Sequence, residues 1–267
     1  MKGSFRMLKS RIAGVAAVEA DTRHTFPPHT HEQYGIGVIY RGAHRSRSSR
    51  GVVEAGCGDV ITVNPGEVHD GAPINEAGRS WRILYCDPSL VAEAIGDISE
   101  GSTRGFEFSN PVIADADIAR RVQRLFAAIT DERSGHGGGC GGGLLALLAA
   151  VIDRTDRDRS RGMPPSIDRA KALIDDDPAA PITLSDLARE SGLSQFKVLR
   201  GFAKATGLTP HAYIVQRRID RARQLIAGGT PLAAAAAVSG FADQSHMTRV
   251  FVRKYGISPG IYADTIA

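Results

Sequence analysis

Three histidines are spaced as the ligands of a metal or of a polar small molecule would be. His29 and His31 stand two residues apart in "FPPHTHEQYGIGVIYRG" (26–42), and His69 lies near the end of "GDVITVNPGEVHDG" (58–71). Residues two apart in a strand point to the same face of its sheet. Two imidazoles placed in this way could chelate zinc, iron or manganese, or could hydrogen-bond to a ligand.

The neighbouring residues favour a polar ligand over a metal. A carboxylate ligand is not cleanly present, because Glu32 has the wrong parity and Gln33 is a poor metal ligand. Arg41 shares the parity of His29 and His31 and would suit a carboxylate or a hydroxyl-rich molecule. Trp81 and Tyr85 share strand parity and would add an apolar wall. The alternatives are an arginine in water at the rim, aromatic residues of an ordinary core, and histidines that are satisfied within the fold. We therefore predict an effector site without metal or cofactor, made of His29, His31, Arg41, His69 and Trp81.

A second group of polar side chains lies near the C-terminus, in "GFADQSHMTRVFVRKYGISP" (240–259). If Met247 and Phe251 point inward along a helix, hydrogen-bonding side chains occupy its opposite side. Arg can bond to guanine, Gln to adenine, and Ser and Thr to either base. The same arginine-two-before-phenylalanine pattern occurs at Arg200 and Arg249, which favours DNA reading over merely solvated helix faces. The predicted DNA-contacting residues are Gln195, Phe196, Lys197, Leu199, Arg200, Gln244, Ser245, Thr248 and Arg249.

The segments that carry these residues form an internal repeat. One copy consists of "TLSDLARESG" (183–192) followed by residues 193–213, and the other consists of "TPLAAAAAVSG" (230–240) followed by residues 241–262. Each copy predicts a helix that is opened by a threonine N-cap and closed by a glycine, then a short turn and a second helix. Pro231 is expected at the first helical position of the second copy. This is the layout of a helix-turn-helix, whose second helix enters the major groove.

The segment between the two copies, "HAYIVQRRIDRARQLIAGG" (211–229), is predicted to form one long helix. The residues expected to face the core are Tyr213, Val215, Ile219, Ala222 and Leu225.

Residues 166–263 resemble the DNA-binding domain of the AraC/XylS family of bacterial transcription regulators. "GFADQSHMTRVFVRKYGISPGIY" is similar to that family's signature over its whole length. The resemblance implies two helix-turn-helix units that are joined by a long helix and read two successive major grooves. Gly201 stands where a larger apolar residue is usual, and Leu199 where a polar one is common. The first unit is therefore expected to bond to fewer base edges, and Leu199 could touch a thymine methyl group.

The histidine segments resemble the two motifs of the cupin β-barrel, the usual sensory domain of this family. Short stretches rich in β-branched residues, divided by turn residues, lie between residues 15 and 90 and agree with such a domain. The three histidines match metal-binding positions of enzymatic cupins, and Arg41 matches a ligand-contacting position of sugar-responsive members. We predict two domains: an all-β cupin-like barrel with two following helices (1–160), and an all-α DNA-binding domain with two helix-turn-helix units joined by a long helix (161–267).

Two stretches are predicted to be loop or linker, and two to be helical. A glycine-rich loop is expected at 134–143, and a charged, proline-broken linker at 154–166. Helical patterns occupy 118–129 and 143–152. The apolar stripe of the first fits the dimer contact that the resemblance implies, and packing on the outside of the barrel is the alternative.

Composition agrees with a DNA-binding protein. The chain has 33 Lys and Arg and 29 Asp and Glu, and residues 164–267 hold 13 and 9 of them, so the positive excess of four lies there. Three cysteines without CxxC spacing support neither a disulfide framework nor a cysteine metal site. No apolar run has bilayer length and no signal peptide is evident, so no membrane contact and a cytoplasmic location are expected.

We therefore expect a sequence-specific, effector-controlled transcription regulator and not an enzyme. Its expected partners are double-stranded DNA, a small-molecule effector and a second copy of the chain, with RNA polymerase as a further candidate. Two alternatives remain open. One is a metal-dependent cupin enzyme fused to a DNA-binding domain, and the other is an architectural DNA-binding protein whose barrel only dimerises.

Overall fold

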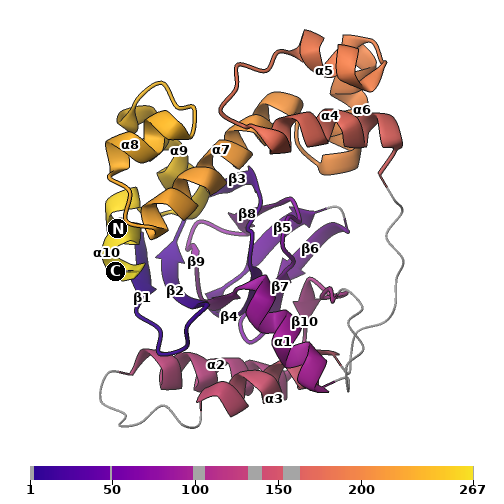
Figure 1. Ribbon diagram of the computed structural model, residues 1–267. Coiled ribbons are helices and arrows are strands. Elements are labelled where there is room, and N and C mark those ends of the chain that lie inside the picture. Colours follow the sequence, from indigo (N-terminus) through magenta and orange to yellow (C-terminus); the bar gives the residue numbers. More distant parts are fainter. Residues whose placement is uncertain (1–2, 49, 99–105, 132–139, 153–162, 267) are drawn as a thin grey trace. The chain divides into compact units, whose positions relative to one another are not determined.

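The protein divides into two compact units, the first of which contains Met1–Thr25 and His31–Asp158 (Figure 1). The second contains Phe26–Thr30 and Arg159–Ala267. The computed structural model describes residues 3–48, 50–98, 106–131, 140–152 and 163–266. The predicted domain boundary at 160/161 lies outside the described residues, as do 134–139 of the glycine-rich loop and 154–162 of the linker.

The first unit is built on two antiparallel sheets. The main sheet has the order β1-β2-β9-β4-β7-β10, and β5 pairs with both β6 and β8 in the second sheet. The strands are β1 (Ser4–Leu8), β2 (Val15–Thr22), β4 (Tyr34–Gly42), β5 (His44–Ser48), β6 (Gly51–Ala55), β7 (Val60–Val63), β8 (His69–Pro73), β9 (Arg79–Cys86) and β10 (Val112–Ile113). Strand β3 (Phe26–His29) lies in the short segment that is counted with the second unit.

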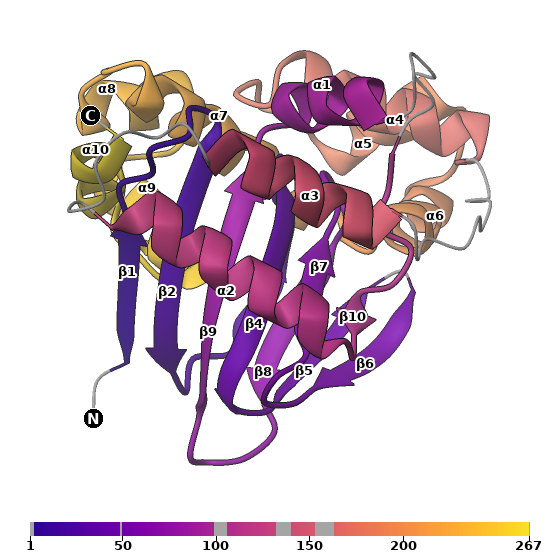
Figure 2. The same ribbon diagram turned by 90° about the horizontal axis from the view of Figure 1, so that it is seen from below.

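Helices α2 (Ala116–Thr130) and α3 (Cys140–Ile152) lie across one face of the main sheet (Figure 2). Asp115 caps α2 by accepting the amide hydrogens of Asp117 and Ile118. The core between sheet and helices contains apolar residues of both layers, among them Ile36, Val38 and Leu84 of the sheet and Ile118, Val122, Leu125, Phe126, Ile129, Leu144, Leu147, Leu148 and Val151 of the helices. The apolar stripe at 118–129 is therefore buried within the chain, and packing on the outside of the barrel explains it. Helix α1 (Pro88–Ile98) precedes this pair.

The second unit is helical, and the predicted fold class is confirmed. Its helices are α4 (Pro165–Asp176), α5 (Leu184–Ser191), α6 (Gln195–Thr206), α7 (Pro210–Ala227), α8 (Leu232–Val238), α9 (Gln244–Tyr255) and α10 (Pro259–Ile266). No helix among the described residues is long and apolar enough to span a bilayer.

The helix boundaries follow local capping chemistry. Thr183 and Asp186 form a capping box at the start of α5, and Gly192 ends that helix in the left-handed conformation, as predicted. The prediction for the second copy is off by one residue. Pro231, not Thr230, is the N-cap of α8, and Ser239 is its C-cap, with the positive φ at Gly240.

Two positions in the second unit have physical explanations that the sequence did not supply. A Cβ at Gly201 of α6 would lie 2.8 Å from Cδ1 of Ile167 of α4, so a larger residue there requires the Ile167 side chain to shift. In α7 the predicted Tyr213, Ile219 and Ala222 are buried, whereas Val215 and Leu225 are only half-buried. The buried side of α7 also contains the polar residues Gln216 and Asp220.

Candidate effector site and DNA-reading helices

Strand β9 divides its side chains between two environments. Leu84 belongs to the core under α2 and α3, and Arg82 lies over the ring of Phe126 of α2 at 5.5 Å. Residues at alternate positions, Arg79, Trp81 and Tyr85, therefore point to the opposite face. We call this opposite face the inner face of the sheet.

The inner face holds two of the predicted histidines. The rings of His31 and His69 stack with their centroids 5.2 Å apart. The ring of Tyr85 is 4.7 Å from that of His31, and its hydroxyl lies 3.4 Å from Nε2 of His31. Nδ1 of His69 lies 3.0 Å from the carbonyl oxygen of Glu67, so the neutral ring donates there and keeps Nε2 as its acceptor. The structure thus brings His31 and His69 together with Tyr85, one of the two aromatic residues expected in an apolar wall.

An arginine that the sequence analysis did not select also lies on this face. Arg79 is fully buried, and its guanidinium stands 4.9 Å from the centre of the Trp81 ring. It donates to the carbonyl oxygens of His24 at 3.2 Å and Gly71 at 3.1 Å. His44 faces it from strand β5, and its Nδ1 has no hydrogen-bond partner among the described residues.

The electrostatics of this group are set by burial. Burial lowers the pKa of His44 to about 3, with further lowering from Arg79 and His69. Burial also lowers the pKa of His69, so both rings are neutral at physiological pH. Arg79 remains a cation, because burial lowers its pKa only to about 10. We call the group His31, His44, His69, Arg79, Trp81 and Tyr85 the inner-face cluster. One buried cation beside the neutral rings of His44 and His69 suits an anionic or hydroxyl-bearing ligand.

Two parity predictions fail here. Strand β3 ends at His29 and β4 begins at Tyr34, so His31 lies in a connection and shares no strand with Arg41. A bulge between Ile39 and Arg41 then shifts the register, so Arg41 pairs with Ser80, which faces away from the inner face. The Arg41 side chain is about half exposed, donates to Ser80 Oγ at 3.1 Å and forms an ion pair with Asp21.

The predicted His29 lies in the segment that is counted with the second unit. It is buried, and its Nδ1 is 2.8 Å from the carbonyl oxygen of Pro27. Trp81 is nearly buried on the inner face, as described above.

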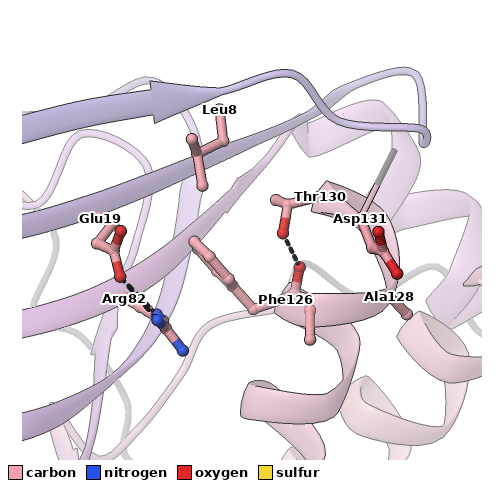
Figure 3. Close-up of a pocket in the computed structure, with 8 residues that line it drawn as sticks. Leu8, Glu19, Arg82, Phe126, Ala128, Thr130 and Asp131 are labelled. Atoms are coloured by element: carbon pink, nitrogen blue, oxygen red, sulfur yellow. Dashed lines mark hydrogen bonds and ion pairs between the residues drawn. The ribbon is translucent and has the colours of Figure 1, made fainter. Parts of the chain in front are cut away.

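A pocket of about 550 Å³ opens on the other, helix-covered side of the main sheet. Figure 3 shows Glu19 and Arg82 on the strands facing Phe126 and Thr130 on α2. Glu19 accepts from both Nε and Nη2 of Arg82 at 2.8 Å. None of the predicted effector residues lines this pocket, which is therefore a different place from the predicted site.

In the second unit, α9 has the two sides that the sequence predicted. Met247, Val250 and Phe251 are buried. The exposed or half-buried residues of its first two turns include the four predicted DNA-contacting ones, Gln244, Ser245, Thr248 and Arg249. Asp243 caps the helix by accepting the amide hydrogen of His246 at 2.6 Å.

Helix α6 repeats this arrangement with different side chains. Val198 and Phe202 are buried, and Ser194 is the N-cap. The predicted Gln195, Phe196, Lys197, Leu199 and Arg200 are all exposed. Gln195 donates to Ser185 Oγ of α5 at 2.8 Å, and the Arg200 guanidinium lies 5.5 Å from the centre of the Phe196 ring.

Comparison with known proteins agrees with both units. Residues 12–148 match the AraC-like ligand-binding domain, and residues 187–265 match a helix-turn-helix domain. The HTH-type transcriptional regulator YbfI of Bacillus subtilis is 30% identical over 232 residues, covering 83% of this chain and 81% of its own. The transcriptional activator RhaR of Klebsiella pneumoniae is 24% identical over 262 residues, covering 94% and 92%. ToxT of Vibrio cholerae O395 has the same fold, with a TM-score of 0.55 at 12% identity and 99% and 98% coverage.

A ligand-binding β unit followed by paired helix-turn-helix motifs defines a DNA-binding regulator with a sensory domain. The chain belongs to the AraC family of transcription regulators.

Proposed function

We propose that α6 and α9 read two successive major grooves of an operator, and that the inner-face cluster receives the effector that controls this binding. The observation that carries the proposal is the match between α6 and α9. Both are capped at the residue before the helix, and both bury an apolar residue at the fourth and eighth helical positions. Both also place Gln and Arg at the same positions, Gln195 and Arg200 in α6 and Gln244 and Arg249 in α9.

Arg200→Ala and Arg249→Ala are each expected to weaken binding to the cognate operator by about 1–3 kcal/mol, because a bidentate contact with guanine is lost. Nonspecific DNA should lose much less affinity. Fluorescence anisotropy with a duplex selected from a random pool, and with a scrambled duplex, measures both effects.

The matched control is Arg45→Ala. Arg45 is an exposed arginine of the first unit that is paired with Glu54, and its loss should leave both affinities unchanged. Equal losses on the selected and scrambled duplexes would show that Arg200 and Arg249 contact only phosphates, contrary to the proposal.

For the effector we propose direct binding by the inner-face cluster. The support is the buried charge of Arg79 beside neutral imidazoles and an aromatic ring. No catalytic step is part of this proposal, and YbfI and RhaR are both named as transcriptional regulators. A thermal-shift screen of metabolites against the full chain tests it.

We further propose that the protein acts as a homodimer, with RNA polymerase as a partner at the promoter. The apolar stripe of α2 is used inside the chain, so a dimer contact through α2 would involve its exposed residues, such as Arg120, Arg121 and Arg124. The full chain and residues 1–160 are both expected to sediment as dimers at tens of micromolar, well above the roughly micromolar Kd of a modest interface. A monomer in both cases would contradict this assembly.

In vitro transcription with purified RNA polymerase tests whether the polymerase is a partner at the promoter.

A further inference from the structure

Helix α6 exposes two large apolar side chains where its counterpart exposes hydroxyl groups. Phe196 is 64% exposed and Leu199 is 40% exposed. They are three residues apart, so they are neighbours on the helix surface, and both lie outside the buried stripe of Val198 and Phe202. In a helix-turn-helix this part of the second helix approaches the base edges.

Aligning α6 with α9 shows which surface residues of the two helices differ. When the buried pair Val198 and Phe202 is aligned with Met247 and Phe251, Phe196 falls on Ser245 and Leu199 falls on Thr248. Gln195 and Arg200 have counterparts of the same type. The two helices therefore share Gln and Arg, and among the differences between them are two neighbouring surface positions at which α9 has a hydroxyl group and α6 has an apolar side chain.

We infer that Phe196 and Leu199 of α6 contact thymine methyl groups. Of the two recognition helices, α6 is then the one that recognises its half-site through apolar contacts. This rests on the proposed function of α6 as a DNA-reading helix. Exposed apolar surface is unfavourable in water. Among the groups that bases present in the major groove, the methyl of thymine is the apolar one.

The spacing of the two side chains fits this partner. Three residues advance about 4.5 Å along a helix axis, which is comparable with the roughly 3.4 Å between adjacent base pairs. Phe196 and Leu199 can therefore reach methyl groups on neighbouring base pairs. The half-site read by α6 is then expected to contain adjacent thymines, while the half-site read by α9 is recognised through hydrogen bonds.

Uracil substitution tests this inference without changing base pairing. An operator is first selected from random duplexes with the purified full chain, and each thymine is then replaced by deoxyuridine, which lacks only the methyl group. The half-site read by α6 is the one at which Arg200→Ala lowers sequence specificity. In it, each of two replacements should weaken binding about fourfold, and both together on the order of tenfold, as expected for burial of methyl-sized groups. Replacements in the other half-site should change the Kd less than twofold.

Variants that install the residues of α9 complete the test. Phe196→Ser with Leu199→Thr should bind the thymine and uracil duplexes equally, and circular dichroism checks that the exposed substitutions leave the fold intact. Ser245→Ala is the matched control and should keep the full uracil sensitivity. If a specific operator is selected but uracil costs nothing, the inference is overturned, and the apolar pair belongs to a contact with protein. If no specific operator is selected at all, the proposed function fails as well.

Discussion

Asp220→Ala is expected to lower the free energy of unfolding of the C-terminal unit by about 3–5 kcal/mol, because it removes one partner from a buried charged network. Asp220 lies on α7 and is 1% exposed. Its Oδ1 accepts from the Tyr255 hydroxyl and from Gln216 Nε2, each at 2.9 Å. Urea denaturation of the full chain, followed by the helical circular dichroism signal, measures the loss.

The network explains why the loss should be large. Gln216 is fully buried and also accepts from Lys254 Nζ of α9 at 2.9 Å, so α7 and α9 are joined at two points. The guanidinium of Arg223 lies 4.7 Å from the centre of the Tyr255 ring. Burial, followed by the nearby Asp220 carboxylate, raises the pKa of Tyr255, so its hydroxyl stays protonated and donates. Without Asp220 these buried donors lose their shared acceptor.

A solvent-exposed ion pair of the same unit provides the control. Arg221 contacts Asp177 at 3.1 Å, with both side chains more than one third exposed. Arg221→Ala should therefore cost less than about 1 kcal/mol. A loss of that small size for Asp220→Ala would mean that water replaces the carboxylate, and it would contradict the structural role given to the network.

The recognition helices could be read from the sequence because their determinants are local. Inward Met247 and Phe251 are four residues apart, and this spacing alone places Arg249 on the other side of the helix. Capping is equally local, and the box at Thr183 was predictable from its residue types. The difference at Pro231 concerns a single terminal residue, and Pro231 has the extended backbone of an N-cap (φ −55°, ψ 143°) without a side-chain capping hydrogen bond.

The effector site was less predictable because it depends on contacts between distant segments. The prediction that His29, His31 and Arg41 share one face assumes that residues 29–41 form one unbroken strand. The chain leaves the strand conformation before β4, and a bulge precedes Arg41, so the assumption does not hold. Asp220 and Gln216 were missed because polar residues are usually exposed, and their burial is made favourable by partners such as Lys254 and Tyr255 of α9, which are distant in the sequence. For Arg79 a signal existed: it has the same strand parity as Trp81 and Tyr85, which were already assigned to one face.

Arg79→Met is expected to abolish the effector response while DNA binding without effector is retained. Arg79 is the buried cation of the inner-face cluster, and methionine fills a similar volume without the charge or the hydrogen bonds to His24 and Gly71. The measurement is reporter expression with and without the metabolite identified by thermal shift, together with operator affinity of the purified variant.

Arg41→Ala is the matched control for this prediction, because Arg41 lies outside the inner face and pairs with Asp21 at the surface. It should respond to effector as the unchanged protein does. Arg79→Lys separates charge from geometry, since a lysine keeps the positive charge but cannot make two parallel hydrogen bonds to a carboxylate. A weakened response in Arg79→Lys, none in Arg79→Met and a normal one in Arg41→Ala would place an anionic group of the effector at the buried guanidinium. Loss of the response in Arg41→Ala with a normal response in Arg79→Met would instead move the site to the surface end of β4 and overturn this assignment.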